Sequence, residues 1–267
     1  MIPPIITLTS DFGPGVFVGL MKGVILNICP DARLVDLEHG VPAQDVLAGA
    51  LVLEQALGVF PKRTVHLAVV DPGVGTSRRA LAVQAGGCLW VGPDNGLFTL
   101  VLAADPAAQC YEISDQSIFR QPVSSTFHGR DIFAPAAAHL ARGRGISSLG
   151  PVISDPVLLD ITEPCDKDGA LTGQVLLADR FGNLMTNLTR QAIEDFLAGQ
   201  PMLVRMAGTL IKGLSPSYVA VAPGQAVAVF NSARRLELAV NQGSLLARLG
   251  LKPGNERGLE VRVEAGE

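Results

Sequence analysis

The sequence has few charged residues and no long apolar run. Charged residues make up 17% of its 267 residues, and the lysines and arginines cluster no more densely than in the pairs Arg78-Arg79 and Arg234-Arg235. With a net charge of −4, the chain lacks the basic face that nucleic-acid binding requires. Apolar stretches such as 46–53 end at a charged residue, Glu54, far short of the roughly 20 residues of a membrane span. We therefore expect neither a nucleic-acid partner nor a membrane anchor.

Cysteine is also scarce. Cys29, Cys88, Cys110 and Cys165 are widely separated and form no C-x-x-C pair, which disfavours a zinc site or a disulfide framework. This spacing is typical of small buried side chains in a reducing compartment. The first residues, MIPPIITLTSDFG, also lack the basic start of a secretion signal. We expect a cytoplasmic protein without a metal site.

The first half of the chain alternates between two kinds of apolar pattern. Apolar runs rich in β-branched residues predict strands, and apolar residues three and four apart predict helices. The expected strands are 5–9, 33–37, 64–70, 81–83 and 88–91, and the expected helices are 17–28, 43–58 and 132–142. This order predicts an α/β domain with a largely parallel sheet, in which ligands lie outside the carboxyl ends of the strands.

The pattern of apolar residues changes after a segment at 145–169 that is rich in Gly, Pro, Ser and Asp and that we interpret as a linker. A boundary near residue 160 divides the chain into domains 1–160 and 161–267. Beyond it, short apolar runs predict strands at 174–178, 202–206, 218–221, 226–230 and 236–240, with helices only at 191–197 and 244–249. Short strands without long helices between them predict a small antiparallel sheet or barrel.

The first polar block is Thr9-Ser10-Asp11-Phe12-Gly13, at the end of the first expected strand. A carboxylate placed there can accept hydrogen bonds from both hydroxyls of a ribose. Asp and Ser are equally typical of a helix cap. The pattern alone leaves both readings of Asp11 open.

A second block, VVDPGVGTSRR, follows the third expected strand and contains Asp71 and Arg78. Its glycines allow the backbone to approach a ligand closely, but they match neither the dinucleotide nor the P-loop signature. A turn with a surface Asp–Arg pair is the alternative.

A third block, Phe127-His128-Gly129-Arg130-Asp131, precedes a helix. A histidine in a loop is a better candidate for proton transfer than one on an apolar face, so His128 is preferred to the others. We interpret His66 and His139 as packing residues and leave His39 open.

Two further blocks lie in the second domain. In the block 179–183, Phe181 can stack on a purine and Asn183 can pair with its ring nitrogens, although a plain hairpin turn fits equally well. The stretch from Asn231-Ser232 to Gly243 adds polar groups after an apolar strand and is ambiguous alone.

Five blocks occur along the chain in the order LTSDFG, VVDPGVGTSRR, GPDNG, FHGRDIFAPAAAHLA and DRFGNLMTN. Together they resemble the S-adenosylmethionine hydroxide adenosyltransferase family, whose relatives are the fluorinating and chlorinating S-adenosylmethionine enzymes. The resemblance implies a Rossmann-like N-terminal domain, a C-terminal β-barrel domain and a homotrimer with active sites between subunits. It implies hydrolysis of S-adenosylmethionine to adenosine and methionine, with S-adenosylmethionine as substrate and no cofactor.

The resemblance also implies roles for single residues. Asp71, Arg78 and His128 match the polar triad at the water site, and Asp11 matches the residue that holds the ribose hydroxyls. In the second domain, Phe181 and Asn183 match residues that bind adenine, and Asp179 and Ser232 match residues that bind the methionine amino group. Halogenating relatives have an arginine after the Asn-Ser pair to hold the methionine carboxylate. This chain has Ala233 there, so either Arg234 or Arg235 is a candidate substitute.

Chemistry favours water over halide as the nucleophile. A halide needs no base and is repelled by a carboxylate, and the fluorinating relatives carry a long insertion where this chain has only Ala85-Gly86-Gly87-Cys88. Arg78 stays protonated, so the proton acceptor is either His128 or Asp71. A halogenase and a non-catalytic sensor of S-adenosylmethionine or adenosine are the competing functions. A dinucleotide oxidoreductase is disfavoured by the missing glycine fingerprint.

Overall fold

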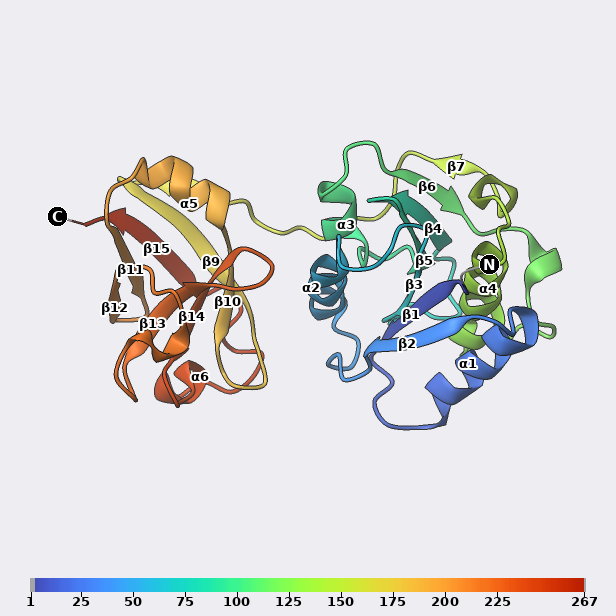
Figure 1. Ribbon diagram of the computed structural model, residues 1–267, viewed down its shortest axis with the longest axis horizontal. Helices are drawn as coiled ribbons and strands as arrows, with labels where there is room; N and C mark the ends of the chain where they lie inside the picture. The colour runs from blue at the N-terminus through green and yellow to red at the C-terminus, as the bar shows by residue number, and fades with distance from the viewer. Residues whose placement is uncertain (1–2, 267) are drawn as a thin grey trace. The chain divides into compact units, whose positions relative to one another are not determined.

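The structure is a computed structural model that describes residues 3–266. The chain divides into two compact units, one that ends at Leu159 and one that begins at Asp160 (Figure 1). Each unit has its own apolar core. Among the described residues, no helix combines the length and the apolar character that a bilayer crossing requires.

The first unit is built on a seven-stranded sheet with the order β2-β1-β3-β5-β4-β6-β7. The strands are β1 (Ile5–Ser10), β2 (Arg33–Glu38), β3 (Val65–Val69), β4 (Ala80–Ala85), β5 (Cys88–Pro93), β6 (Gln109–Glu112) and β7 (Val152–Ile153). Every residue of β3 is buried, as expected for a central strand covered on both faces. The expected Rossmann-like α/β architecture is confirmed.

The sheet is parallel in one half only. Strands β2, β1, β3 and β5 run parallel, whereas β4, β6 and β7 pair antiparallel. The reversal occurs at a two-residue turn between β4 and β5, where Gly86 and Gly87 have φ values of 61° and 77°. Two consecutive positive φ values are typical of the tight hairpin turn that follows strand twist.

Helices cover both faces of this sheet. Figure 1 shows α1 and α4 on one face and α2 and α3 on the other. Their bounds are α1 (Val16–Ile28), α2 (Val46–Ala56), α3 (Thr99–Ala103) and α4 (Ala134–Ala141), with short 3₁₀ helices η1 (Gln116–Ile118) and η3 (Ile146–Ser148). A π-helical turn, η2 (Gly129–Phe133), precedes α4. The helical segment therefore begins earlier than the expected helix at 132–142, and its first turn is π-helical instead of α-helical.

The second unit is an antiparallel, nearly closed sheet with the order β12-β11-β15-β9-β10-β14-β13, to which β8 is added on β9. Its strands are β8 (Cys165–Lys167), β9 (Ala170–Ala178), β10 (Leu184–Thr189), β11 (Met202–Met206), β12 (Thr209–Lys212), β13 (Ala226–Phe230), β14 (Arg235–Val240) and β15 (Glu260–Ala265), and its helices are α5 (Arg190–Leu197) and α6 (Leu245–Arg248). The expected barrel-like second domain is confirmed.

One expected strand of this unit is wrong. Residues 218–221 form mainly a 3₁₀ helix, η4 (Tyr218–Ala220). Tyr218 is 41% exposed and Val219 is 73% exposed, so the segment has no buried face to pack into a sheet. The Tyr218 hydroxyl instead donates a hydrogen bond of 2.5 Å to Glu237.

Close strand packing in the first unit gives a stability prediction. A Cβ on Gly92 would lie 2.3 Å from the Ala68 carbonyl oxygen and 3.0 Å from the Phe98 ring. Gly92→Ala should lower the free energy of unfolding by about 3 kcal/mol, the upper range for overpacking. Urea unfolding followed by fluorescence of Trp90, the single tryptophan and buried in β5, measures this unit.

Gly19→Ala is the matched control. This glycine lies inside α1 with nothing within 4 Å of an added Cβ, so alanine should be neutral or stabilise by up to about 1 kcal/mol. Equal midpoints for the Gly92 variant and the wild type would contradict the packing argument.

Candidate active site

Asp71, Arg78 and His128 are in direct contact. The Arg78 guanidinium donates through Nε to Asp71 Oδ1 at 2.9 Å and through Nη2 to Asp71 Oδ2 at 2.5 Å. The same Nη2 lies 2.8 Å from His128 Nδ1. The side chains of Arg78 and Asp71 are only 10% and 5% exposed. The sequence-predicted triad is therefore one connected cluster, and the alternative of a surface Asp–Arg pair does not hold.

Asp71 lies in this cluster because it follows closely after the end of β3. Asn95 fixes that end, because its side-chain amide donates to the carbonyl oxygen of Val70 at 2.9 Å. The following loop turns at Gly75, whose φ is 79° and whose added Cβ would lie 2.3 Å from the carbonyl oxygen of Ser125. Glycine is required there by both conformation and space. The loop that carries Arg78 is thus pressed against the segment that leads to His128.

His128 is the residue before the π-helical turn η2. The turn is fixed from inside by Asp131, which is fully buried and accepts hydrogen bonds from Arg130 Nε at 2.7 Å and from the Ser124 amide at 2.9 Å. Asp131 therefore ties the start of the helix to the preceding loop, and Arg130 is its ion-pair partner. These contacts hold the His128 imidazole against Arg78.

The contact with Arg78 determines which ring nitrogen of His128 carries the proton. A guanidinium only donates hydrogen bonds, so His128 Nδ1 must be an acceptor and the proton of the neutral ring lies on Nε2. Burial lowers the pKa of His128 below its usual 6.5, and the positive charge of Arg78 lowers it further, against the opposing effect of Asp71. Phe133 lies beneath Arg78, with 5.0 Å between the guanidinium carbon and the ring centre.

Asp11 lies at the same sheet edge. It follows β1, and β1 pairs in parallel with β3 so that Ser10 is opposite Val69. The ring of Phe12 is 5.9 Å from the ring of Phe127, the neighbour of His128. Asp11 does not cap α1, whose N-terminus has no side-chain cap; its Oδ2 accepts the Gln44 amide at 2.8 Å.

In the second unit, Asp179 organises the turn between β9 and β10. Its Oδ1 accepts the amides of Phe181 and Asn183 at 2.8 and 2.9 Å, and its Oδ2 accepts the Asn183 side chain at 3.0 Å. Phe181 is 62% exposed, with Arg180 stacked 4.8 Å from its ring centre. The turn thus presents an exposed ring beside a buried amide, so the hairpin and the binding interpretation are compatible.

Ser232 lies in an exposed loop shaped by Asn231. The Asn231 Oδ1 accepts the amides of Ala233 and Arg235 at 3.0 and 3.1 Å. Arg235 is buried, with Nη1 at 3.4 Å from the Asn187 carbonyl oxygen, whereas Arg234 is exposed with a φ of 58°. Of the two arginines after Ala233, Arg234 is the one that the loop presents to solvent.

Sequence reasoning missed several residues that support the site. The block GPDNG is a turn by composition, yet Asn95 holds Val70, and Asp94 accepts from Arg79 Nε at 2.8 Å. The GPDNG block is visible in the sequence as one of the motifs of the first half. Its contacts could not be predicted, because they depend on which strands are paired. His66 is buried against Trp90, with 4.0 Å between ring centres, and burial lowers its pKa to about 4, as expected of a packing residue.

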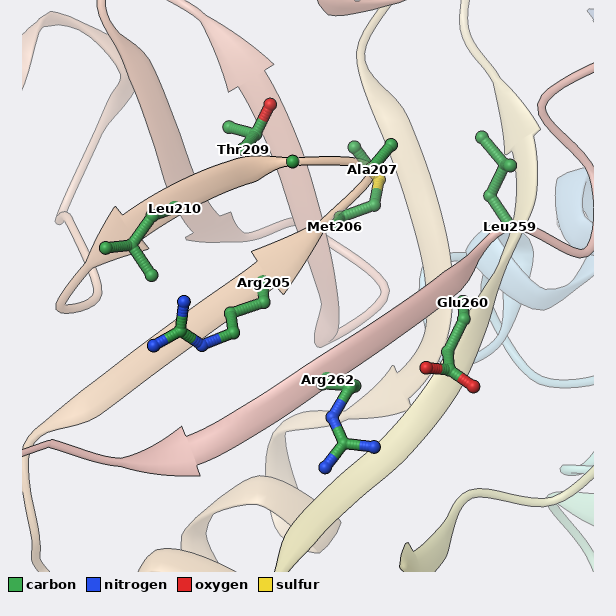
Figure 2. Close-up of a pocket in the computed structure, with 9 residues that line it drawn as sticks. Arg205, Met206, Ala207, Thr209, Leu210, Leu259, Glu260 and Arg262 are labelled. Carbon is green, nitrogen blue, oxygen red and sulfur yellow. The ribbon is translucent and has the colours of Figure 1, made fainter.

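The second unit also has a shallow hollow of about 410 Å³ on its surface. Figure 2 shows Arg205 on β11, Leu210 on β12 and Arg262 on β15 around it. Both arginines form ion pairs with Glu264, and none of the sequence-predicted site residues lines the hollow. Within residues 3–266 there is also no group of three or more metal-ligating side chains. The polar cluster at the end of β3 is therefore the candidate active site.

Comparisons with known proteins find matches for both units of the chain. The family model described as "SAM hydroxide adenosyltransferase N-terminal domain" matches residues 6–150, and that of the C-terminal domain matches residues 173–257. A protein of Salinispora tropica named (R)-S-adenosyl-L-methionine hydrolase is 38% identical over 98% of both chains. One of the same name from Thermus thermophilus is 40% identical over 92% of this chain and 95% of its own. A fluorinase of Nocardia brasiliensis is 28% identical over 98% of this chain and 97% of its own.

Solved structures resemble the whole chain. A conserved protein from Thermotoga maritima superposes with a TM-score of 0.88 at 33% identity, covering 97% of this chain and 99% of that one. A conserved protein from Thermus thermophilus gives a TM-score of 0.78 at 38% identity, covering 98% of this chain and 99% of that one. From the two matching domains and these relatives, the chain belongs to the SAM hydroxide adenosyltransferase family.

Proposed function

We propose that this protein is an enzyme that hydrolyses S-adenosylmethionine to adenosine and methionine. The observation that carries the proposal is the Asp71–Arg78–His128 cluster at the carboxyl end of β3, in which the charged side chains of Arg78 and Asp71 are almost fully buried. Relatives that match nearly the whole chain at 38–40% identity are named for this reaction. Fluorinases are more distant, at 28% identity.

The substrate already carries an activated leaving group. The sulfonium departs as the neutral thioether of methionine, so no acid is needed there. Water is a weak nucleophile with a pKa of about 15.7, and the site must orient it in line with the breaking carbon–sulfur bond at the ribose 5′ carbon. The protein's contribution is therefore placement and charge.

We assign the water to Asp71 and Arg78, with Asp71 as proton acceptor. Each carboxylate oxygen has two lone pairs, so Asp71 retains acceptor capacity beside its bonds to Arg78. The only acceptor of neutral His128, Nδ1, faces Arg78. The geometry therefore supports His128 as the group that holds the guanidinium, a choice that the sequence leaves open.

A weak base is sufficient for this step. The oxygen of water forms the bond to the 5′ carbon while the electrons of the carbon–sulfur bond leave with methionine. The new bond makes the attacking oxygen positively charged, so its proton is strongly acidic and passes to the Asp71 carboxylate. Arg78 holds the Asp71 carboxylate in the orientation that receives this proton, and Asp71 offsets the repulsion between Arg78 and the sulfonium.

The remaining site residues bind the substrate in this proposal. Asp11 accepts the ribose hydroxyls, Phe181 stacks on adenine and Asn183 pairs with it. Asp179 and Ser232 bind the methionine amino group. Exposed Arg234 is the candidate for the carboxylate in place of the arginine that halogenating relatives have at 233.

No cofactor takes part, since the sulfonium supplies the driving force. We place the reaction in the cytosol, to which four free cysteines are suited. The family resemblance supports a homotrimer in which neighbouring subunits share each active site.

Product analysis tests the function. Incubation of the purified protein with S-adenosylmethionine in heavy-oxygen water should give methionine and adenosine labelled at the 5′ hydroxyl, because water attacks the 5′ carbon. Mass spectrometry with and without chloride or fluoride measures this. A halogenated nucleoside would identify a halogenase instead, and stoichiometric binding without methionine release would identify a sensor.

Loss of the carboxylate should stop turnover. Asp71→Asn keeps the shape but removes the charge and the proton acceptor, so kcat should fall by about 10²- to 10⁴-fold while adenosine still binds. Asp155→Asn is the matched control, because Asp155 also pairs with an arginine, Arg79, but is 76% exposed, and its kcat should remain within about twofold of wild type. Equal turnover in Asp71→Asn and wild type would refute the assignment.

The lowered pKa of His128 predicts the acidic limb of the rate profile. Protonation at Nδ1 would abolish its acceptance from Arg78 and add a positive charge, so activity should fall only when the pH drops through the lowered pKa. The midpoint of the limb in kcat/KM should lie below 6.5, the usual value for histidine.

His128→Asn tests the origin of this limb. Asparagine can place an amide oxygen near the Nδ1 position, where it accepts from Arg78 but does not titrate in this range. The limb should therefore disappear in this variant. A wild-type midpoint above 6.5, or an unchanged limb in His128→Asn, would count against the role of His128.

A further inference from the structure

A second row of hydrogen bonds lies beside the candidate active site. Lys22 Nζ on α1 donates to Asp36 Oδ2 at 2.6 Å. Asp36 Oδ1, on β2, lies 3.0 Å from His39 Nε2, and His39 Nδ1 lies 2.7 Å from the Ser10 hydroxyl. Ser10 is the last residue of β1 and immediately precedes Asp11.

Serine, histidine and aspartate in a row also occur at nucleophilic sites. Here Ser10 is only 1% exposed, so its oxygen is not accessible to a substrate. The row of hydrogen bonds ends inside the protein. It can therefore act on a ligand only through the residues that Ser10 and His39 hold in place.

Asp36 sets the direction of the hydrogen bonds that it accepts, and the neutral form of His39 sets the direction of the next one. An ionised carboxylate only accepts, so His39 carries a proton on Nε2. The neutral ring then has a bare Nδ1, which accepts from the Ser10 hydroxyl. The Ser10 oxygen keeps its lone pairs for the Phe12 amide, which lies 3.4 Å away.

His39 holds the same loop through its backbone. Its carbonyl oxygen accepts the Gly13 amide at 2.8 Å, and Gly13 has a φ of 62°. Together with the Gln44 amide on Asp11 Oδ2, these bonds hold the loop 10–13 at both ends and in the middle. Asp11 Oδ1 receives no hydrogen bond from the described residues and is available to a ligand.

We infer that His39 is a positioning residue that, through Ser10, holds Asp11 in place to receive the ribose diol of the bound nucleoside. This inference rests on the proposed function, in which Asp11 binds the ribose. His39 itself touches no substrate atom. Its side chain should affect substrate binding through the diol and leave the chemical step unchanged.

Paired nucleosides test the inference. Calorimetry measures the Kd of adenosine, which has the diol, and of 2′,3′-dideoxyadenosine, which lacks it. His39→Ala should weaken adenosine about tenfold, which is the effect of about one lost hydrogen bond, and should leave the Kd of the dideoxy compound within twofold. KM for S-adenosylmethionine should rise about tenfold while kcat stays within twofold. His139→Ala, at another partly buried histidine of this unit, is the control and should change neither Kd.

Two conservative variants separate positioning from general structure. Asparagine at 39 presents an amide near the Nδ1 position and can still bind Ser10, whereas glutamine presents one near Nε2 and can bind only Asp36. His39→Asn should therefore restore adenosine affinity more than His39→Gln. Ser10→Ala breaks the same link from the other end, so it should reproduce the His39→Ala pattern and serves if that variant fails to fold.

The outcomes are distinct. Equal weakening of both nucleosides, or no weakening of adenosine, in His39→Ala and Ser10→Ala would overturn the inference and leave the proposed function intact. If the wild type binds no adenosine and releases no methionine, the proposed function fails, and the inference fails with it. Selective loss of adenosine binding with unchanged kcat is the expected result.

Discussion

Arg78 and Asp71 face each other with side chains that are 10% and 5% exposed, so water solvates neither charge well. A buried charge that loses its partner costs several kcal/mol, so each of the two charged groups stabilises the other in this place. The bidentate geometry, with Nε and Nη2 on the two carboxylate oxygens, fixes the orientation of both. One edge of the guanidinium then lies against His128 Nδ1 and its face lies over Phe133. The orientation of the polar groups in this cluster therefore depends on one ion pair.

The fold brings the pair together by combining a central strand with loops that cannot move far. Asp71 follows β3, which is buried along its whole length, and Asn95 holds the carbonyl of Val70 at the point where the strand ends. The loop to Arg78 is held by the close approach of Gly75 to the Ser125 carbonyl. A site placed on rigid elements and supported by surrounding hydrogen bonds keeps reacting groups within the tolerance that in-line attack requires. The cost is a set of glycine positions at which no other residue fits.

Most of the architecture could be predicted from the sequence because apolar periodicity reports directly on burial. The alternation in the first half and the short strands of the second gave the two fold classes. The predicted strand at 218–221 was wrong because a short apolar run without a buried face resembles a strand in sequence. The π-helical turn before α4 was not predicted because nothing in the local sequence distinguishes it from an ordinary helix. The loops offered Asp71, Arg78 and His128 as separate candidates, and the family resemblance joined them into one triad. The supporting contacts of Asn95 and His39 were not predicted. Those contacts depend on which strands are neighbours, and that is decided by the whole sheet rather than by any motif.

The same ion pair bears on the choice between water and halide. A buried guanidinium alone would attract an anion, and the sulfonium of the substrate would strengthen that attraction. Asp71 cancels the charge of Arg78 at a distance of one hydrogen bond, so an anion entering the site would meet a carboxylate instead of an unpaired cation. Water avoids this repulsion and has what a halide lacks, a proton that the carboxylate can accept after the carbon–oxygen bond forms. In the proposed mechanism, neutralisation of the arginine and acceptance of the proton are two effects of the Asp71 side chain, and both favour hydrolysis.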